Sequence, residues 1–238
     1  MYTKPQDHQP AAQPERFNQR SYVLNGLQYN EYTDSKNRLY VDVSETRELK
    51  IKNFTSRLQK IGLGKYAEMD LKDLLPIKAL AGKTPLEIYH HMSRNQKNLF
   101  LNGAPGTGKT TLTIALAKHA LENNIKPYIV RWTNMLSKIK GGFHNGERDN
   151  IFEHINKTQL LVLDELGMDR KRAATDFEAE TLFDIVTARY GNRAPWIMTT
   201  NLSFEHLEKL YGRSIMDRIR DKQSTLELNF ASEKAYRL

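Results

Sequence analysis

The sequence predicts an α/β domain built on a parallel sheet, with a smaller region N-terminal to it. Two observations lead to this fold class. The stretch LFLNGAPGTGKTTLTIALA reads as a strand, a glycine-rich turn and a helix, and further short apolar runs alternate with helical stretches. Such alternation is typical of a parallel sheet with helices on both faces. The five apolar runs are Leu99–Leu101, Tyr128–Val130, Leu160–Leu163, Trp196–Met198 and Leu226–Leu228.

The composition limits the class of protein. The chain has 238 residues, of which 39% are hydrophobic, so it can form one good core and a small accessory region. The absence of cysteine excludes disulfides and cysteine-ligated zinc, and it fits a reducing compartment. No apolar run approaches the ~18 residues that cross a bilayer, and the N-terminus lacks the apolar centre of a signal peptide. We therefore expect a cytoplasmic protein with no membrane partner.

The first 83 residues predict a tail followed by a small region of their own. Residues 1–20 are rich in Pro and Gln, which predicts a flexible tail. Within residues 21–83, tyrosines and aliphatic residues predict short strands around a turn near Asp34–Asn37. Ser44 is then the predicted N-cap of a helix that stops at Gly62.

The larger domain is expected to open with a helix. The sequence TPLE (Thr84–Glu87) combines a capping box with proline at the first helical position. We therefore place the domain boundary near residue 83 and assign residues 84–238 to the α/β domain.

The glycine-rich turn is predicted to bind phosphate. GAPGTGKT matches the pattern G-x-x-x-x-G-K-[ST], in which glycines let backbone N–H groups face phosphate oxygens. A helix beginning near Lys109 would direct its positive end at the same place. Lys109 would then reach the β- and γ-phosphates, and Thr110 would offer its hydroxyl to Mg²⁺. The predicted nucleotide contacts are Gly103, Ala104, Pro105, Gly106, Thr107, Gly108, Lys109, Thr110 and Thr111.

Two later apolar runs end in side chains that suit ATP chemistry. QLLVLDEL ends in adjacent acids, of which Asp164 is predicted to hold Mg²⁺ together with Thr110. Glu165 is predicted to orient and deprotonate the attacking water. PWIMTTN ends at Asn201, which is predicted to position that water or to contact the γ-phosphate. We therefore expect ATP and Mg²⁺ as cofactors and ATP hydrolysis as the activity.

Taken in order, these motifs resemble those of the AAA+ ATPases from Leu99 to Leu238. The resemblance implies a five-stranded parallel sheet with strand order 5-1-4-3-2. It also implies a homo-oligomer in which an arginine of the next subunit completes each ATP site. In YGRSIMDRIRDK the first choice for this arginine is Arg218, the second is Arg213 and the third is Arg220. A guanidinium fits because it stays charged and matches phosphate geometry.

Within this group, the stretches TNMLSKIKGGF, ARYGNR and TTNLSFEHL and the ending AYRL resemble the DnaC/DnaI-type helicase loaders of bacteria and phages. The IstB-like transposition ATPases share nearly all of these features. Only 37 residues follow Asn201, too few for the helical lid usual in AAA+ proteins. By resemblance, Arg237 is a candidate second nucleotide-sensing arginine. The N-terminal region would grip a replicative helicase in the bacterial cytoplasm.

The expected function is ATP-dependent loading of a replicative DNA helicase onto single-stranded DNA. Hydrolysis, stimulated by DNA or the partner, would switch assembly and release. The net charge of +8 favours a polyanionic partner. Basic and aromatic side chains after strand ends are candidate DNA contacts: Lys138, Lys140, Phe143, Arg170, Lys171 and Arg172.

Two other functions remain open from the sequence. The first is an IstB-like ATPase that polymerises on duplex DNA and directs a transposase. The second is a binding module that uses ATP only as a structural ligand. A small-molecule kinase also has a phosphate loop, but it explains neither the pair of acids nor the arginine-rich segment.

Overall fold

The chain divides into two compact units between Lys52 and Asn53. The computed structural model describes residues 15–74, 84–167 and 174–230, without the side chains of residues 143–145. The division lies earlier than the boundary near residue 83 that the sequence suggested. The reason is that the apolar side chains of Leu58, Leu63 and Leu71 are buried within the second unit.

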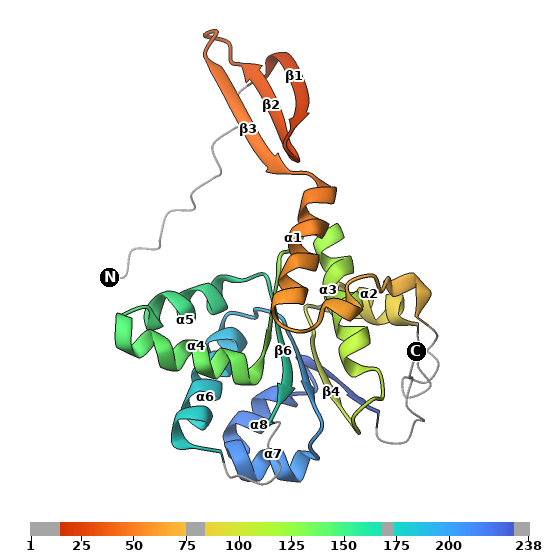
Figure 1. The fold of residues 1–238 in the computed structure, drawn as a ribbon, viewed down its shortest axis with the longest axis vertical. Helices are drawn as coiled ribbons and strands as arrows, with labels where there is room; N and C mark the ends of the chain where they lie inside the picture. The colour runs from red at the N-terminus through yellow and green to blue at the C-terminus, as the bar shows by residue number, and fades with distance from the viewer. Residues whose placement is uncertain (1–14, 75–83, 168–173, 231–238) are drawn as a thin grey trace, which may run out of the picture. The chain divides into compact units, whose positions relative to one another are not determined.

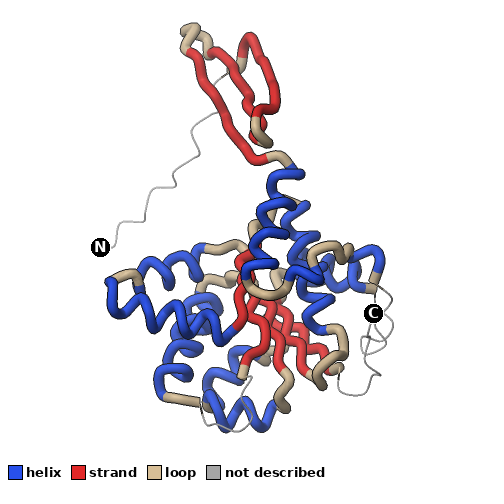
Figure 2. Tube along the Cα trace, in the orientation of Figure 1, coloured by secondary structure: helices blue, strands red, loops and turns tan. Residues whose placement is uncertain are grey.

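The first unit contains a three-stranded antiparallel sheet in the order β1-β2-β3, which Figure 2 shows in red. Its strands are β1 (Phe17–Leu24), β2 (Leu27–Thr33) and β3 (Leu39–Glu45). The strands and the turn between β2 and β3 agree with the prediction. However, β1 begins inside the segment that was expected to be tail, because Phe17 pairs with Thr33.

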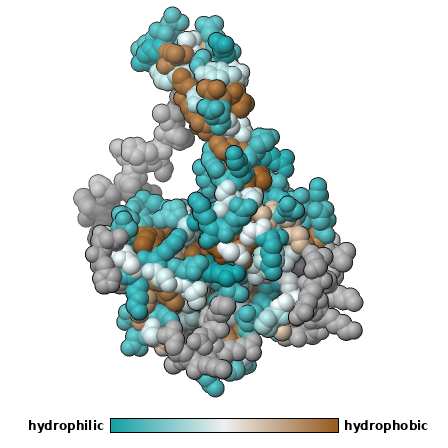
Figure 3. Space-filling view, in the orientation of Figure 1, coloured by the Kyte–Doolittle hydropathy of each residue, from teal (hydrophilic) through white to brown (hydrophobic). Residues whose placement is uncertain are grey.

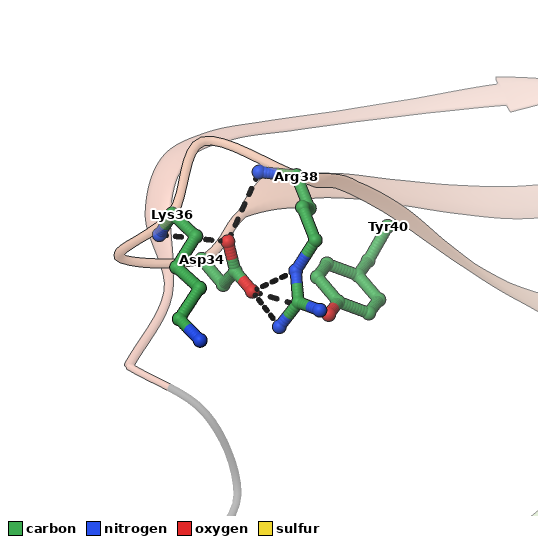
Figure 4. A network of polar contacts seen from close by, with 4 residues as sticks. All are labelled: Asp34, Lys36, Arg38 and Tyr40. Atoms are coloured by element: carbon green, nitrogen blue, oxygen red, sulfur yellow. Dashed lines mark hydrogen bonds and ion pairs between the residues drawn. The ribbon is translucent and has the colours of Figure 1, made fainter.

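The turn between β2 and β3 is organised around Asp34, as Figure 4 shows. The Asp34 Oδ1 atom accepts the backbone N–H groups of Lys36 and Arg38 at 2.9 and 3.0 Å. Its Oδ2 atom accepts from Arg38 Nε at 2.8 Å and from the Tyr40 hydroxyl at 3.2 Å. These bonds, chiefly those from Arg38, lower the pKa of Asp34 to about 2.

Helix α1 (Arg47–Lys60) begins and ends at recognisable signals. The N-cap prediction was wrong by two residues, because Ser44 pairs within β3 and the Thr46 Oγ1 atom accepts the Leu49 N–H group at 3.3 Å. At the other end Gly62 has a φ of +74°, and the Leu63 N–H group donates to the Leu58 carbonyl at 2.8 Å. This is the Schellman arrangement that a glycine permits. Two 3₁₀ turns follow, η1 (Gly64–Tyr66) and η2 (Leu71–Asp73).

The second unit is built on a five-stranded parallel sheet in the order β5-β6-β7-β4-β8. All five strands that the sequence predicted are present. Numbered within this unit, the order is the expected 5-1-4-3-2, read from the opposite edge. The strands are β4 (Asn98–Asn102), β5 (Pro127–Arg131), β6 (Leu160–Leu166), β7 (Trp196–Thr200) and β8 (Thr225–Asn229).

Helices cover both faces of this sheet, with α2 and α3 on one side and α4 to α6 on the other (Figure 1). Phe100, Leu161 and Leu163 belong to the core that packs against the α4 side. Their buried neighbours along the strands, such as Leu101 and Val162, face the opposite way because strand side chains alternate. The helices are α2 (Pro85–Asn95), α3 (Lys109–Glu122), α4 (Trp132–Asn145), α5 (Arg148–Lys157), α6 (Asp176–Gly191), α7 (Phe204–Tyr211) and α8 (Arg213–Ile219).

Two local features of this unit bear on its stability. Thr84 and Glu87 form the predicted capping box at the start of α2.

The fully buried Arg189 of α6 donates to the carbonyls of Ile155, Thr158 and Pro195, at 2.6 to 3.2 Å. These carbonyls lie at the end of α5 and just before β6 and β7. Burial lowers the pKa of Arg189 to about 10. Among the described residues no helix is long and apolar enough to cross a membrane.

Candidate functional site

The glycine-rich loop connects β4 to α3 at the carboxyl edge of the sheet. A side chain at Gly103, whose φ is +145°, would place its Cβ only 2.8 Å from the Cβ of Phe230. Gly108, with a φ of +92°, is the residue from which α3 starts. Both positions therefore require glycine. The resulting turn ends at the N-terminus of α3, where free backbone N–H groups favour an anion.

Lys109 lies inside this loop with only 6% of its surface exposed. Its Nζ atom donates to the carbonyls of Gly103 and Ala104 at 2.9 and 2.8 Å, and it lies 3.4 Å from Thr107 Oγ1. The ammonium group is thus held within the loop by the backbone itself. This is the position that the sequence analysis assigned to a lysine reaching the β- and γ-phosphates.

Asp164, near the end of β6, points at the start of α3. Its Oδ1 atom accepts from Thr199 Oγ1 at 2.7 Å and from Thr110 Oγ1 at 3.3 Å. Its Oδ2 atom is buried and has no hydrogen-bond partner among the described residues. A buried carboxylate oxygen without a partner is costly unless a cation neutralises it. The donor chemistry of Asp164 and Thr110 therefore fits Mg²⁺, which stays a prediction.

Glu165 follows in an unusual backbone conformation. Its φ is +60°, and the pairing of β6 with β7 shifts between Leu163 and Leu166. This bulge places the Glu165 side chain on the cleft described below, next to that of Asp164. Its backbone N–H group donates to Thr199 Oγ1 at 2.9 Å. Strained backbone of this kind persists only where the surrounding structure holds it.

Arg131 is a neighbour of Glu165 that the sequence analysis missed. It ends β5, where it lies opposite Asp164 in the strand register. Its Nε atom is 3.9 Å from Glu165 Oε2, and within the described part of the chain neither atom has a hydrogen-bond partner. The pair is therefore held by charge rather than by a hydrogen bond. Because Arg131 follows an ordinary apolar strand, no motif in the sequence marks it.

A cleft of about 630 Å³ is lined by the phosphate loop, Lys109, Thr110 and Glu165. Asn201 lies on it as predicted, directly after β7. Thr199 also lines it and makes the central hydrogen bonds, although the prediction rested on Asn201 alone. The signal for Thr199 is the pair of threonines that ends the otherwise apolar strand PWIMTT.

The segment around η1 also lines the cleft. Lys65, Tyr66 and Met69 belong to the same lining as the loop residues Gly106 and Thr111. The sequence analysis assigned no role to this segment, because it contains no recognisable motif. The segment combines an aromatic ring, a thioether and an ammonium group beside the phosphate loop, which suits a flat heterocyclic base.

The three candidate arginines lie on or just after α8. Arg218 donates to the Ser214 carbonyl and hydroxyl at 3.0 and 2.8 Å, and Arg213 Nε lies 3.8 Å from Asp217 with a side chain 82% exposed. Arg220 is more firmly held, since it contacts Glu227 Oε2 at 2.7 Å and lies 3.9 Å from the centre of the Phe204 ring. None of the three is among the described residues that line the cleft of their own chain.

The other predicted residues are only partly covered by the structure. Lys138 and Lys140 are exposed on α4. Phe143 belongs to α4, but its side chain lies outside the described part. Arg170, Lys171, Arg172 and Arg237 lie outside the described residues altogether.

The sheet order and the phosphate loop after β4, facing the acids of β6, define a P-loop domain of the AAA+ class. Within this class the chain belongs to the family described as IstB-like ATP binding protein, which matches residues 78–237.

Relatives in sequence are similar over part of the chain. The chain is 28% identical over 137 residues to "Replicative helicase loader DnaC" of Buchnera aphidicola, a match covering 56% of this chain and 54% of the relative. It is 29% identical over 128 residues to the protein of the same name in Escherichia coli K12, covering 53% and 51%. It is 32% identical over 123 residues to "Uncharacterized protein YdaV" of that strain, covering 51% and 48%. The matched region thus spans about half the length of these relatives.

Solved structures share the fold. A crystal structure of the DnaC helicase loader has a TM-score of 0.59 at 22% identity, covering 69% of this chain and 98% of the other. A crystal structure of DnaI has a TM-score of 0.58 at 20% identity, covering 69% and 92%. The replication initiator DnaA bound to AMPPCP and single-stranded DNA has a TM-score of 0.57 at 16% identity, covering 68% and 50%. At these identities the similarity concerns the fold alone.

Proposed function

We propose that this protein is an ATPase that loads a replicative DNA helicase onto single-stranded DNA. The observation that carries the ATPase assignment is the cleft lined by Thr110, Glu165 and Thr199, with the buried Asp164 accepting hydrogen bonds from both threonines. The helicase assignment is supported by the names of the sequence relatives.

In the proposed mechanism, backbone N–H groups of the loop and Lys109 bind the phosphates of ATP. Asp164 and Thr110 would hold Mg²⁺, which neutralises phosphate charge when bound. Glu165 orients a water molecule and accepts its proton as the water attacks the γ-phosphate. Asn201 contributes an amide to the same cleft. Arg131 sets the direction of the Glu165 carboxylate through their charge contact.

The first unit is the proposed contact with the helicase. Brown hydrophobic surface gathers over its strands in Figure 3. The exposed side chains include Leu24, Leu39, Val41 and Val43, which are 47–66% exposed. Tyr22 and Tyr29 stack beside them on the same face, with ring centres 5.2 Å apart. An apolar face on so small a sheet favours a protein partner over water.

Assembly into a homo-oligomer is the second part of the proposal. Arg218, or failing that Arg213, would enter the ATP site of the next subunit, which makes ATP the ligand that joins neighbouring copies. Arg220 is the weakest of the three candidates because Glu227 and Phe204 already hold it. The assembled chains would bind DNA through the basic surface that includes Lys138 and Lys140.

A second function is supported by the family itself, whose description is IstB-like ATP binding protein. Such an ATPase would polymerise on duplex DNA and direct a transposase. Capture experiments with the full-length chain as bait separate the two functions. Recovery of a replicative helicase supports the loader, and recovery of a transposase overturns it in favour of the alternative.

The loading function is tested with helicase, DNA and two variants. Lys109→Ala should fail to bind ATP, and Glu165→Gln should bind ATP without hydrolysing it. The unwinding assay uses a partial duplex whose single-stranded part is coated by binding protein. On this substrate the wild-type chain should allow the helicase to begin unwinding. Lys109→Ala should not. Unwinding that is equally fast without the chain would contradict the proposal.

A further inference from the structure

A second hollow in the same unit lies apart from the ATP cleft. It has a volume of about 690 Å³ and is formed by the last turns of α1, the edge strand β5 and helix α4. It shares no lining residue with the ATP cleft. We name it the α1–α4 groove. The residues that α1 and α4 contribute to it are polar or basic, apart from Ile61 just after α1. The lining residues are Asn53, Ser56, Arg57, Lys60, Ile61, Ile129, Val130, Asn134, Ser137 and Lys138.

Three cations line this groove without a carboxylate. They are Arg57, Lys60 and Lys138, and none of them forms an ion pair with an acidic residue in the described part of the chain. Three like charges in one hollow repel one another, and an anion that binds between them relieves that repulsion. The groove is thus electrostatically suited to an anionic ligand.

Both walls present their polar residues at helical spacing. On α1, Ser56 and Lys60 are four residues apart, so they share a face. On α4 the same holds for Asn134 and Lys138. Hydroxyl and amide groups therefore stand beside the cations on each wall, and both groups donate hydrogen bonds to phosphate oxygens.

Arg57 is held in place rather than free in solvent. Its guanidinium carbon lies 4.2 Å from the centre of the Tyr128 ring, and this ring in turn meets His154 edge to face at 4.7 Å. Lys138 Nζ is 6.0 Å from the same ring, so both walls converge on Tyr128. A guanidinium fixed by stacking loses little further freedom when it binds a planar or tetrahedral anion.

We infer that the α1–α4 groove binds the phosphate backbone of single-stranded nucleic acid. The basic side chains of α1 and α4 suit phosphate, and the hydroxyl and amide groups beside them add hydrogen-bond donors. The inference rests on the proposed function for the presence of DNA, and it deepens that proposal by naming Arg57 and Lys60 as contacts. Neither residue belongs to a sequence motif, and both come from the segment that connects the first unit to the sheet.

The salt dependence of DNA binding tests this inference. Fluorescence anisotropy with labelled oligo(dT) would compare the wild-type chain with the double variant Lys60→Gln/Lys138→Gln, whose side chains are exposed. The double variant should bind ~10-fold more weakly near 0.1 M salt, and the slope of log K against log [salt] should fall by about 1.4. The matched control is Lys126→Ala, an exposed lysine outside the groove, which should behave like the wild type.

Cross-linking provides a readout that does not depend on affinity. Because the sequence contains no cysteine, a single introduced thiol is unique. A photoreactive group on Ser137→Cys should cross-link to oligo(dT), whereas the same group on Ser93→Cys, on the exposed face of α2, should not. Unlabelled oligo(dT) should compete with this reaction, while ATP, inorganic phosphate and an equal length of duplex should compete poorly.

These outcomes separate the groove from the ATPase. Unchanged affinity and slope in the double variant, or equal cross-linking at both positions, would overturn the inference that the groove binds nucleic acid. If ATP is hydrolysed in parallel assays, the ATPase assignment is unaffected by that result. If the double variant loses oligo(dT) binding and no protein hydrolyses ATP, the result would support the nucleic-acid site in the groove and overturn the ATPase assignment. If the wild-type chain binds no oligo(dT), both the inference about the groove and the DNA-binding part of the proposed function would be overturned.

Discussion

At the scale of single residues, the Thr199 hydroxyl links the two acids of the cleft. It donates to the Asp164 carboxylate and accepts from the Glu165 backbone N–H group, so it fixes one carboxylate and the backbone that carries the other. Thr199→Val keeps the volume and leaves that buried N–H group without a partner, which costs about 1–3 kcal/mol of unfolding free energy. Urea denaturation should show this loss, and kcat for ATP should fall by at least about tenfold. Thr199→Ser should restore most of both, and a Val variant with normal kcat would contradict this role.

Arg131 is a second residue whose effect is specific to Glu165. Arg131→Ala removes the cation 3.9 Å from the carboxylate, so the Glu165 side chain, which lines the cleft, loses the contact that sets its direction. An ion pair of this exposure contributes about 1 kcal/mol at most, so we expect basal ATP hydrolysis to fall by up to ~5-fold. The ATP dissociation constant, measured by calorimetry, should not change. Arg131→Lys should remain near the wild-type rate, and a change in affinity without a change in rate would show that Arg131 contacts the nucleotide instead.

At the scale of elements, Asp34 holds the β2–β3 turn through its ionised carboxylate. Its pKa in the folded chain is about 2, below the ordinary value of 3.8, so the unfolded state binds the proton more readily. The stabilisation is therefore complete above about pH 4 and is lost as the pH falls through 2. Hydrogen exchange of the β2 and β3 amides should show protection that falls between these values. Asp34→Asn should show low protection at neutral pH with no such dependence, whereas Asp42→Asn, at an exposed ion pair, should resemble the wild type.

Arg189 joins three elements through backbone carbonyls. Its guanidinium reaches the end of α5 and the residues before β6 and β7, where four carbonyls accept from it. Arg189→Leu would leave buried carbonyls unsatisfied, so the free energy of unfolding should fall by about 3 kcal/mol or more in urea denaturation. The exposed Arg193→Ala should change it by less than about 0.5 kcal/mol. Equal stabilities of the two variants would show that solvent replaces the guanidinium.

An element can be predicted from the sequence when a local pattern of residues determines it, and not when it depends on contacts between distant segments. The five strands of the second unit and the phosphate loop are predictable because continuous apolar runs and the G-x-x-x-x-G-K-T pattern are local signals. Thr46 as the N-cap was not predicted, because β3 extends through Ser44 by pairing with β2. Arg131 comes close to Glu165 only through the order of the strands, and the η1 segment reaches the cleft only through the path of the chain. Such contacts have no local signature in the sequence.

At the scale of the whole molecule, the proposed mechanism places the parts of one ATP site on two chains. Glu165 lines the cleft of its own chain, whereas Arg218 does not line that cleft within the described residues. Head-to-tail contact is the arrangement that brings the Arg218 of one copy to the cleft of the next, and it makes hydrolysis depend on protein concentration.

Mixing two inactive variants tests this division of the site. Glu165→Gln lacks the base but keeps Arg218, and Arg218→Ala keeps the base but lacks the arginine. In an equimolar mixture with random assembly, about a quarter of the interfaces combine an intact Glu165 with an intact Arg218 from the neighbour. The mixture should therefore recover roughly a quarter of the wild-type ATP turnover, although each variant alone has almost none. The double variant Glu165→Gln/Arg218→Ala, mixed with either single variant, is the control and should recover nothing. Turnover that stays absent in the mixture of single variants, while both still bind ATP, would exclude Arg218 as the residue that completes the neighbouring site and would direct the same experiment to Arg213.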